Sequence, residues 1–318
     1  MNKKPCLERE GISFHCGYME QKDIIPFLPD STGRKKRIAL ACPHDEHTKE
    51  TVERALKQGI ASFALFIADK TDSWAKDMER RFPSEVETVE CDSQEDAAAK
   101  AVEMAKSGKA DILMKGTINT DVLLRAALDK ERGILKKGKV MTHIAVASIP
   151  SYNKPLIFSD AAVIPRPALE QFDAIVGYCA QAARKLGVKK PNIALIHFSE
   201  KNNAKFEHTL HYQEIIRRAK EGRYGEVNIG GPMDVKTACD AESGAIKGIT
   251  SPVVGNADVL IFPNIESGNT FYKTISLFAN ATTAGWLEGT DVPVIVSSRA
   301  DTVDSKFLSL ALVCRLGE

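Results

Sequence analysis

Two serines and an arginine follow a short apolar run near the end of the chain. Ser297, Ser298 and Arg299 come directly after residues 292–296, and the carboxylate of Asp304 is about a turn further on. A buried strand that ends in this way brings hydroxyl donors, a fixed positive charge and a candidate proton acceptor to one point. This combination predicts a site that stabilises negative charge and moves a proton.

Three further polar clusters follow other apolar runs, and ligands in open α/β sheets bind at the carboxyl ends of strands. The first cluster, Lys115-Gly116-Thr117, combines a glycine, a hydroxyl and the start of a helix, which suits it to bind an oxyanion or a phosphate. An ordinary turn capped by Asn119 explains the same residues equally well. Loop lysines mark the second cluster, and a turn into a helix marks the third. The clusters are Lys115-Gly116-Thr117, residues 198–205, and Ser267-Gly268-Asn269 with Tyr272 and Lys273.

The histidines do not predict a metal site. Two pairs have a spacing that could place both imidazoles on one helix face, but neither has a third ligand in a known pattern, so surface helix starts explain them better. These pairs are His44 with His47 and His208 with His211. His143 and His197 each stand alone in an apolar strand, where a hydrogen-bonded core histidine is a better interpretation than a catalyst.

The bulk composition excludes several classes of protein. The 43 Lys and Arg residues of the 318-residue chain balance 42 Asp and Glu residues, so no net field favours nucleic acid or a membrane. Seven scattered cysteines without a Cys-x-x-Cys pair are typical of reduced core residues, and no apolar run reaches 18 residues. We therefore expect a cytoplasmic protein that does not span a membrane.

Short apolar runs alternate with amphipathic segments, which predicts an α/β protein with mainly parallel sheets. The expected strands are 37–42, 61–68, 86–91, 110–115, 140–148, 155–159, 192–198, 227–230, 257–263 and 292–297. The expected helices are 46–58, 93–107, 119–129, 168–186, 208–221, 267–285 and 304–314. The length favours two lobes, and two prolines in residues 150–155 suggest a crossing between them.

In this order, the clusters resemble the phosphate acetyltransferase and phosphate butyryltransferase family. The resemblance is clearest over residues 257–273, where Phe-Pro-Asn leads into Ser-Gly-Asn and Tyr-Lys, and over residues 293–299, where the last strand ends in Ser-Arg. It extends upstream through Lys115-Gly116 and the Asp160 segment. The sequence Ile-Pro-Ser-Tyr at 149–152 is closer to the butyryl branch.

The resemblance implies two α/β/α lobes with an interlobe cleft, similar to isocitrate and isopropylmalate dehydrogenases. Residues 1–150 with 288–318 would form the first lobe and residues 151–287 the second, in a homodimer or higher homo-oligomer. The implied reaction converts acyl-CoA and phosphate to acyl phosphate and CoA, with no metal and no permanently bound cofactor. Butyryl or a similar short acyl group is the expected substrate.

The resemblance also suggests roles for individual residues. Ser298 and Arg299 would stabilise the transition state, and Asp304 would be the base, with Asp160 in reserve. The phosphate and CoA would be bound by Lys115, Gly116, Thr117, Asp160, Ser267, Gly268, Asn269, Tyr272 and Lys273. Two departures affect these roles: Ser305 occupies the position of the acetyl-branch aspartate base, and Leu277 occupies that of an arginine.

Two other functions remain open from the sequence. A metal- and nucleotide-dependent β-decarboxylating dehydrogenase could use Asp301 and Asp304 as metal ligands at helical spacing, although no arginine-rich substrate motif is present. A non-catalytic module that binds CoA would result if the change at Ser305 had removed the base.

Overall fold

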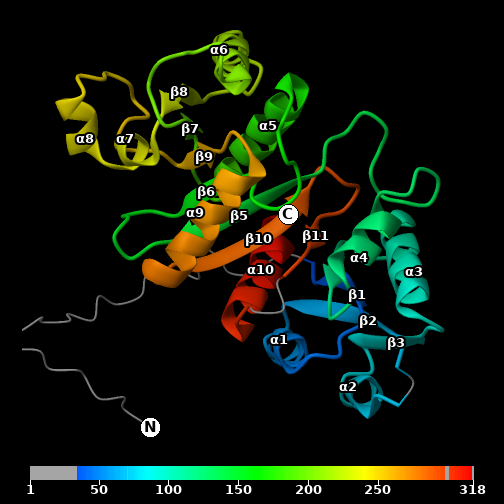
Figure 1. Ribbon diagram of the computed structural model, residues 1–318. Coiled ribbons are helices and arrows are strands. Elements are labelled where there is room, and N and C mark those ends of the chain that lie inside the picture. The colour runs from blue at the N-terminus through cyan, green and yellow to red at the C-terminus, as the bar shows by residue number, and fades with distance from the viewer. Residues whose placement is uncertain (1–33, 70, 298–300, 317–318) are drawn as a thin grey trace, which may run out of the picture.

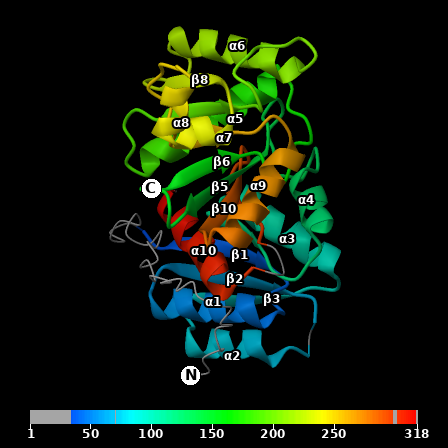
Figure 2. The same cartoon turned by 60° about the vertical axis from the view of Figure 1, so that its left-hand side comes forward.

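The strands in the described part of the chain all join in one sheet. The structure is a computed structural model that describes residues 34–69, 71–297 and 301–316. Its 11 strands lie in the order β3-β2-β1-β4-β11-β10-β5-β6-β9-β7-β8. The molecule is elongated, with helix α2 at one end and helix α6 at the other (Figures 1 and 2).

Helices and strands alternate over most of the chain. The strands are β1 (Lys36–Ala41), β2 (Ala61–Ile67), β3 (Val86–Glu90), β4 (Ile112–Lys115), β5 (Thr142–Ser148), β6 (Leu156–Ser159), β7 (Asn192–Ile196), β8 (Asn228–Met233), β9 (Val259–Ile261), β10 (Thr282–Glu288) and β11 (Val294–Ile295). The helices are α1 (Glu46–Lys57), α2 (Ser73–Arg81), α3 (Gln94–Lys106), α4 (Thr120–Ala127), α5 (Leu169–Lys185), α6 (Glu207–Lys220), α7 (Val235–Cys239), α8 (Ala241–Ile246), α9 (Ile265–Phe278) and α10 (Val303–Leu316).

Two antiparallel strands lie in the middle of the sheet and connect its halves. β10 pairs with β5 from Thr282↔Ser148 to Glu288↔Thr142, and it also pairs antiparallel with β11. On the far side, β5 pairs antiparallel with β6. The remaining pairings are all parallel, so each half of the sheet is parallel within itself and the two halves run in opposite directions.

Alternate residues of each strand enter cores on opposite faces of the sheet. In β1, Ile38 and Leu40 belong to a core that α1, α2, α5, α6 and α10 cover, and this core extends to Ile193 of β7 in the other half. Ala39 of β1 faces a second core, covered by α3 and α4. A third core, under α7 and α9, includes Phe158 of β6. Helices therefore cover both faces.

The prediction of an α/β fold with a mainly parallel sheet is confirmed. The strands form one continuous sheet, however, and not a separate sheet in each lobe, because β10 and β5 pair along their whole length. The predicted lobe boundaries fall close to the ends of these strands, at Ser148 and Glu288. The division into lobes stays a prediction.

The predicted helix over 267–285 is wrong in its second half. α9 ends at Phe278, the chain turns at Asn280 with a left-handed φ of 49°, and β10 begins at Thr282. Apolar residues continue past the turn, so a helical period fits the sequence there. The partner that makes this segment a strand is β5, more than 130 residues earlier in the chain.

Three helices were not predicted. α2 is a full helix with Asp72 as its cap, whereas α7 and α8 are short helices capped by Asp234 and Asp240. In the ranges that the structure describes, none of these or the other helices is long and apolar enough to cross a bilayer.

Two glycines in helices give a direct test of the packing between α9 and the end of β6. A Cβ atom at Gly268 would lie 2.1 Å from the backbone oxygen of Asp160, whereas one at Gly177 of α5 would meet nothing within 4 Å. We expect Gly268→Ala to lower the free energy of unfolding by about 1–3 kcal/mol, since the backbone must move. Gly177→Ala should raise it by up to about 1 kcal/mol, because alanine favours the helix. Urea unfolding measures both, and equal effects would contradict the close approach.

Candidate active site

The loop after β4 is held tightly against the end of β1. The amide of Gly116 donates to the Ala41 oxygen, and both the amide and hydroxyl of Thr117 donate to the Cys42 oxygen at 2.8 and 2.9 Å. A Cβ atom at Gly116 would lie 2.1 Å from that same Cys42 oxygen, so only glycine fits. The Lys115 ammonium is buried and donates to the carbonyls of Gly116 and Ile118, which stiffens the loop.

The segment after β11 lies beside this loop. Because Ile295 pairs with Met114 in parallel register, Ser297 comes level with Gly116. Ser298 and Arg299, the predicted stabilisers of the transition state, lie outside the described residues. Their described neighbour Ser297 is buried, and its hydroxyl has no hydrogen-bond partner in the part of the chain that the structure describes.

A groove of about 820 Å³ opens between the C-terminal end of α9 and the start of α10. Tyr272 and Lys273 line one side, with the Lys273 ammonium 4.4 Å from the centre of the Tyr272 ring. The Tyr272 hydroxyl lies 3.4 Å from the Thr283 hydroxyl on β10. Burial raises the pKa of Tyr272, so its phenol stays protonated and can donate. Further lining residues are Arg54, Ser276, Leu277, Asp301, Thr302, Asp304, Ser305 and Leu308.

The predicted base Asp304 lies at the solvent-exposed edge of this groove. Its side chain is 76% exposed, and its Oδ1 accepts from the Arg54 guanidinium at 2.7 Å. The backbone amide of Ser305, at the position of the acetyl-branch base, donates to the Thr302 hydroxyl at 3.2 Å. The next residue, Lys306, is buried and donates to Asp45 and Thr48 at the start of α1. The start of α10 is thus fixed against α1, with Asp304 on its outer side.

Asp160 is bound on nearly all sides by the protein. Its carboxylate accepts from the hydroxyl of Thr142 at 2.7 Å and from the backbone amides of His143, Ala162, Val163 and Ile164. These five donors occupy the lone pairs that a proton or a ligand would need. Asp160 therefore has a structural role: its carboxylate holds the segment that follows β6 against the start of β5.

The N-terminal turn of α9 is built onto the Asp160 segment. The backbone amide of Ser267 donates to the side-chain oxygen of the capping residue Asn264, and the side-chain amide of Asn269 donates to the Ala161 backbone oxygen at 2.9 Å. Gly268 permits the close approach described above. From Ser267 to Lys273 the helix rises roughly 9 Å. Ser267, Gly268 and Asn269 therefore lie at one end of α9, whereas Tyr272 and Lys273 lie along the groove.

His143 is a core residue, as the sequence suggested, but its ring is not fully hydrogen-bonded within the described residues. Its side chain is buried, but Nδ1 has no hydrogen-bond partner among the described residues. Burial lowers its pKa, while the charges of Asp160 and Asp301 oppose that effect. The imidazole packs edge-on near Tyr272, with ring centres 6.4 Å apart. No motif marks it; the only signal was a titratable residue in an apolar strand.

His197 is also only partly bonded. Its Nδ1 lies 3.0 Å from Nε2 of His208, and its Nε2 has no partner in the described ranges. Burial lowers the pKa of His208 to about 4, so this pair is neutral near pH 7. Within the described residues, no group of three or more His, Cys, Asp or Glu side chains could hold a metal ion.

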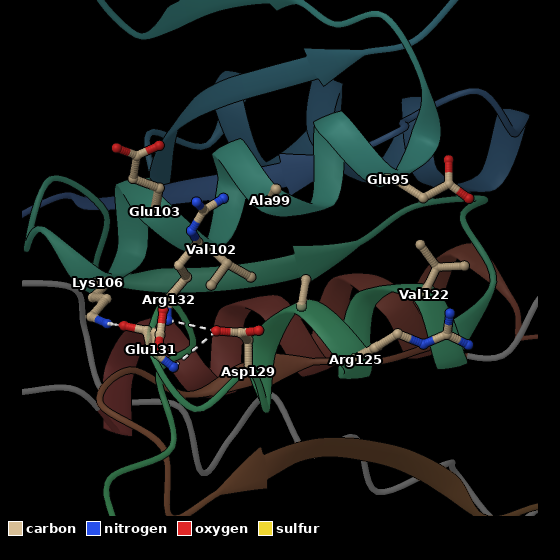
Figure 3. A pocket seen from close by; sticks show the side chains of 11 residues that line it. Glu95, Ala99, Val102, Glu103, Lys106, Val122, Arg125, Asp129, Glu131 and Arg132 are labelled. Carbon is tan, nitrogen blue, oxygen red and sulfur yellow. Dashed lines mark hydrogen bonds between the residues drawn. The ribbon is translucent and has the colours of Figure 1, made fainter.

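A second groove, of about 740 Å³, lies between α3 and α4 (Figure 3). Small apolar side chains such as Ala99 and Val122 form its floor. Its rim carries both signs of charge, since Lys106 bonds the Glu131 carbonyl and Asp129 accepts from the amides of Glu131 and Arg132. The mixed rim does not select an anion, and the groove includes no residue that the sequence singled out.

Removal of the Asp160 carboxylate tests its structural role. We expect Asp160→Ala to lower the free energy of unfolding by about 3 kcal/mol or more, because several buried donors lose their acceptor. Thermal and urea unfolding measure the loss. The exposed Asp121→Ala provides the control and should change stability by less than about 0.5 kcal/mol. A stable, merely inactive Asp160→Ala protein would contradict the structural role.

Comparisons with known proteins identify the family of this chain. Residues 70–314 match the family described as phosphate acetyl/butaryl transferase. The phosphate acetyltransferase of Thermotoga maritima is 33% identical over 282 residues, which is 88% of this chain and 95% of that protein. The phosphate butyryltransferase of Clostridium acetobutylicum is 34% identical over 278 residues, or 87% and 92% of the two chains.

The fold comparison gives the same result. The crystal structure of a branched-chain phosphotransacylase from Enterococcus faecalis superposes with a TM-score of 0.78 at 29% identity, covering 89% of this chain and 99% of the other. The predicted family is therefore confirmed: this chain belongs to the phosphate acetyltransferase and phosphate butyryltransferase family of phosphate acyltransferases.

Proposed function

We propose that the chain transfers a short acyl group, butyryl or one of similar size, between CoA and phosphate. The observation that carries this proposal is the groove in which Tyr272 and Lys273 of α9 face the residues that follow Ser298 and Arg299. Family membership supplies the reaction class. A cytoplasmic location and a homodimer remain parts of the proposal. None of the five described cysteines forms a disulfide within the described residues, which agrees with a reducing compartment.

The groove supports a preference for a longer acyl group than acetyl. Leu277 lines it at the position of an acetyl-branch arginine, and Leu308 of α10 adds a second apolar side chain. An extra methylene that packs against such side chains gains about 0.8 kcal/mol when it is fully buried. The relatives do not decide the acyl length, since the acetyl and butyryl enzymes are equally similar to this chain.

The chemistry requires three contributions from the protein. As the thiol sulfur of CoA attacks the carbonyl carbon of the acyl phosphate, the C–S bond forms and the C–O bond to phosphate breaks. Negative charge grows on the carbonyl oxygen and on the departing phosphate, where Arg299 and hydroxyl or backbone donors can stabilise it. Lys273 adds a positive charge on the groove wall. A base must also accept the thiol proton, because the thiol pKa is about 8.5.

The first test is the reaction itself. Phosphate-dependent release of free CoA thiol should be faster, as kcat/KM, from butyryl-CoA than from acetyl-CoA, with propionyl- and branched acyl-CoA between or beside them. The measurement also separates the alternatives. CoA binding without release would indicate the non-catalytic module, and NAD reduction with a 2-hydroxy acid and Mn²⁺ would indicate the dehydrogenase.

The second test concerns Arg299. We expect Arg299→Ala to lower kcat/KM by about 10²-fold or more, since a lost contact to transition-state charge costs that much. Arg80→Ala is the matched control, because Arg80 is exposed on α2 at the far end of the molecule and pairs only with Asp77 among the described residues. A change within a few-fold for Arg299→Ala would exclude it from the transition state.

A further inference from the structure

The most unusual polar group in the described part of the chain is the imidazole of His143. The residue is only 8% exposed, and its Nδ1 is buried without a hydrogen-bond partner among the described residues. Leaving a buried polar atom without a hydrogen-bond partner destabilises the folded state. Such an atom in a folded protein calls for an explanation, and a ligand that binds there is one.

The fold leaves room for this ring beside the groove. His143 lies on β5 opposite β10, and a Cβ atom at Gly285 of β10 would lie 2.8 Å from Nε2. The absence of a side chain at Gly285 therefore lets the imidazole occupy this space. On its other side the ring contacts Tyr272, which lines the groove.

Charged groups from three elements act on the imidazole. Asp160 at the end of β6 and Asp301 before α10 favour its protonated form, whereas Lys273 of α9 disfavours it. Burial is the largest effect and lowers the pKa of His143 below its usual 6.5. The ring is consequently neutral near pH 7 and able to accept a proton. Asp301, Lys273 and Tyr272 line the groove, so the two charges that act on the imidazole and the ring that packs against it also line the place of the proposed substrate.

The other candidates for a base are less suitable. Asp304 is exposed and paired with Arg54, Ser305 has no basic side chain, and the carboxylate of Asp160 is filled by protein donors. In the described residues around the groove, His143 alone combines burial with an unused basic nitrogen.

We propose that His143 is a catalytic residue that accepts the thiol proton of CoA. This inference rests on the proposed function. The thiol proton moves to neutral His143 while the sulfur electron pair forms the C–S bond with the acyl carbon. The C–O bond breaks, its electrons leave with phosphate, and the imidazolium returns the proton to a phosphate oxygen. The products are acyl-CoA and hydrogen phosphate, and His143 is neutral again.

The pH dependence of kcat/KM tests this role in the direction from butyryl phosphate and CoA to butyryl-CoA. With a working base, the wild-type rate should be nearly constant from about pH 7 to about pH 8.5 and fall at lower pH as the imidazole becomes protonated. His143→Gln should be about 10²-fold slower or more near pH 7. Its rate should rise about tenfold per pH unit toward the thiol pKa of about 8.5, because the reaction then depends on thiolate already present.

His197→Gln is the matched control. His197 is likewise buried with a ring nitrogen that has no partner among the described residues, but it directly follows β7 and contacts His208 and Phe198. Its variant should keep the wild-type profile. A His143→Gln profile that runs parallel to the wild type, whether equal or uniformly slower, would show a structural role only and overturn the proposal.

Two further measurements keep the outcomes distinct. His143→Asn is assayed in the same way if circular dichroism shows that His143→Gln does not fold. Should neither fold, the wild-type profile decides, since a rate that itself climbs about tenfold per pH unit up to about pH 8.5 means that no base acts. A wild type that transfers no acyl group refutes the proposed function, whereas an active wild type with an unaffected His143→Gln refutes only the base.

Discussion

The antiparallel pairing of β10 with β5 is the interaction on which the rest of the molecule depends. Seven residue pairs, from Thr282↔Ser148 to Glu288↔Thr142, join two parallel half-sheets that run in opposite directions. β10 also carries the chain from the end of α9 back to β11. The groove, the register of β11 and the space around His143 all follow from where this strand lies.

Much of the alternating pattern could be predicted because each element carries its own signal. Parallel strands such as β2 are continuous apolar runs, and helices such as α3 begin at a capping residue, Ser93. β10 has no such local signal. Its Thr-Thr-Ala-Gly start follows α9 after a short turn, and only the distant partner β5 makes it a strand. Non-local pairing decides its structure, and a single sequence does not display that pairing.

The sequence likewise predicted some of the site residues correctly and misjudged others. Residue types that can hold charge pointed to Tyr272, Lys273 and Asp304, and the groove contains all three. The same reasoning could not separate a carboxylate that reacts from one that holds a turn. Asp160 ends a strand as a base would, yet five donors surround it. His143 was dismissed because its surroundings are apolar in sequence, whereas the missing hydrogen bond becomes visible only in three dimensions.

The different positions of Asp304 and His143 show how a proton acceptor is chosen by its environment. The Asp304 carboxylate is exposed to solvent and already paired with the Arg54 guanidinium. Burial instead destabilises the charged form of His143, and the carboxylates of Asp160 and Asp301 limit how far its pKa falls. A buried neutral imidazole also avoids placing a permanent negative charge beside a phosphate. A base of this kind suits an acyl-transfer site better than a carboxylate, because the substrate there already carries negative charge that a second anion would repel.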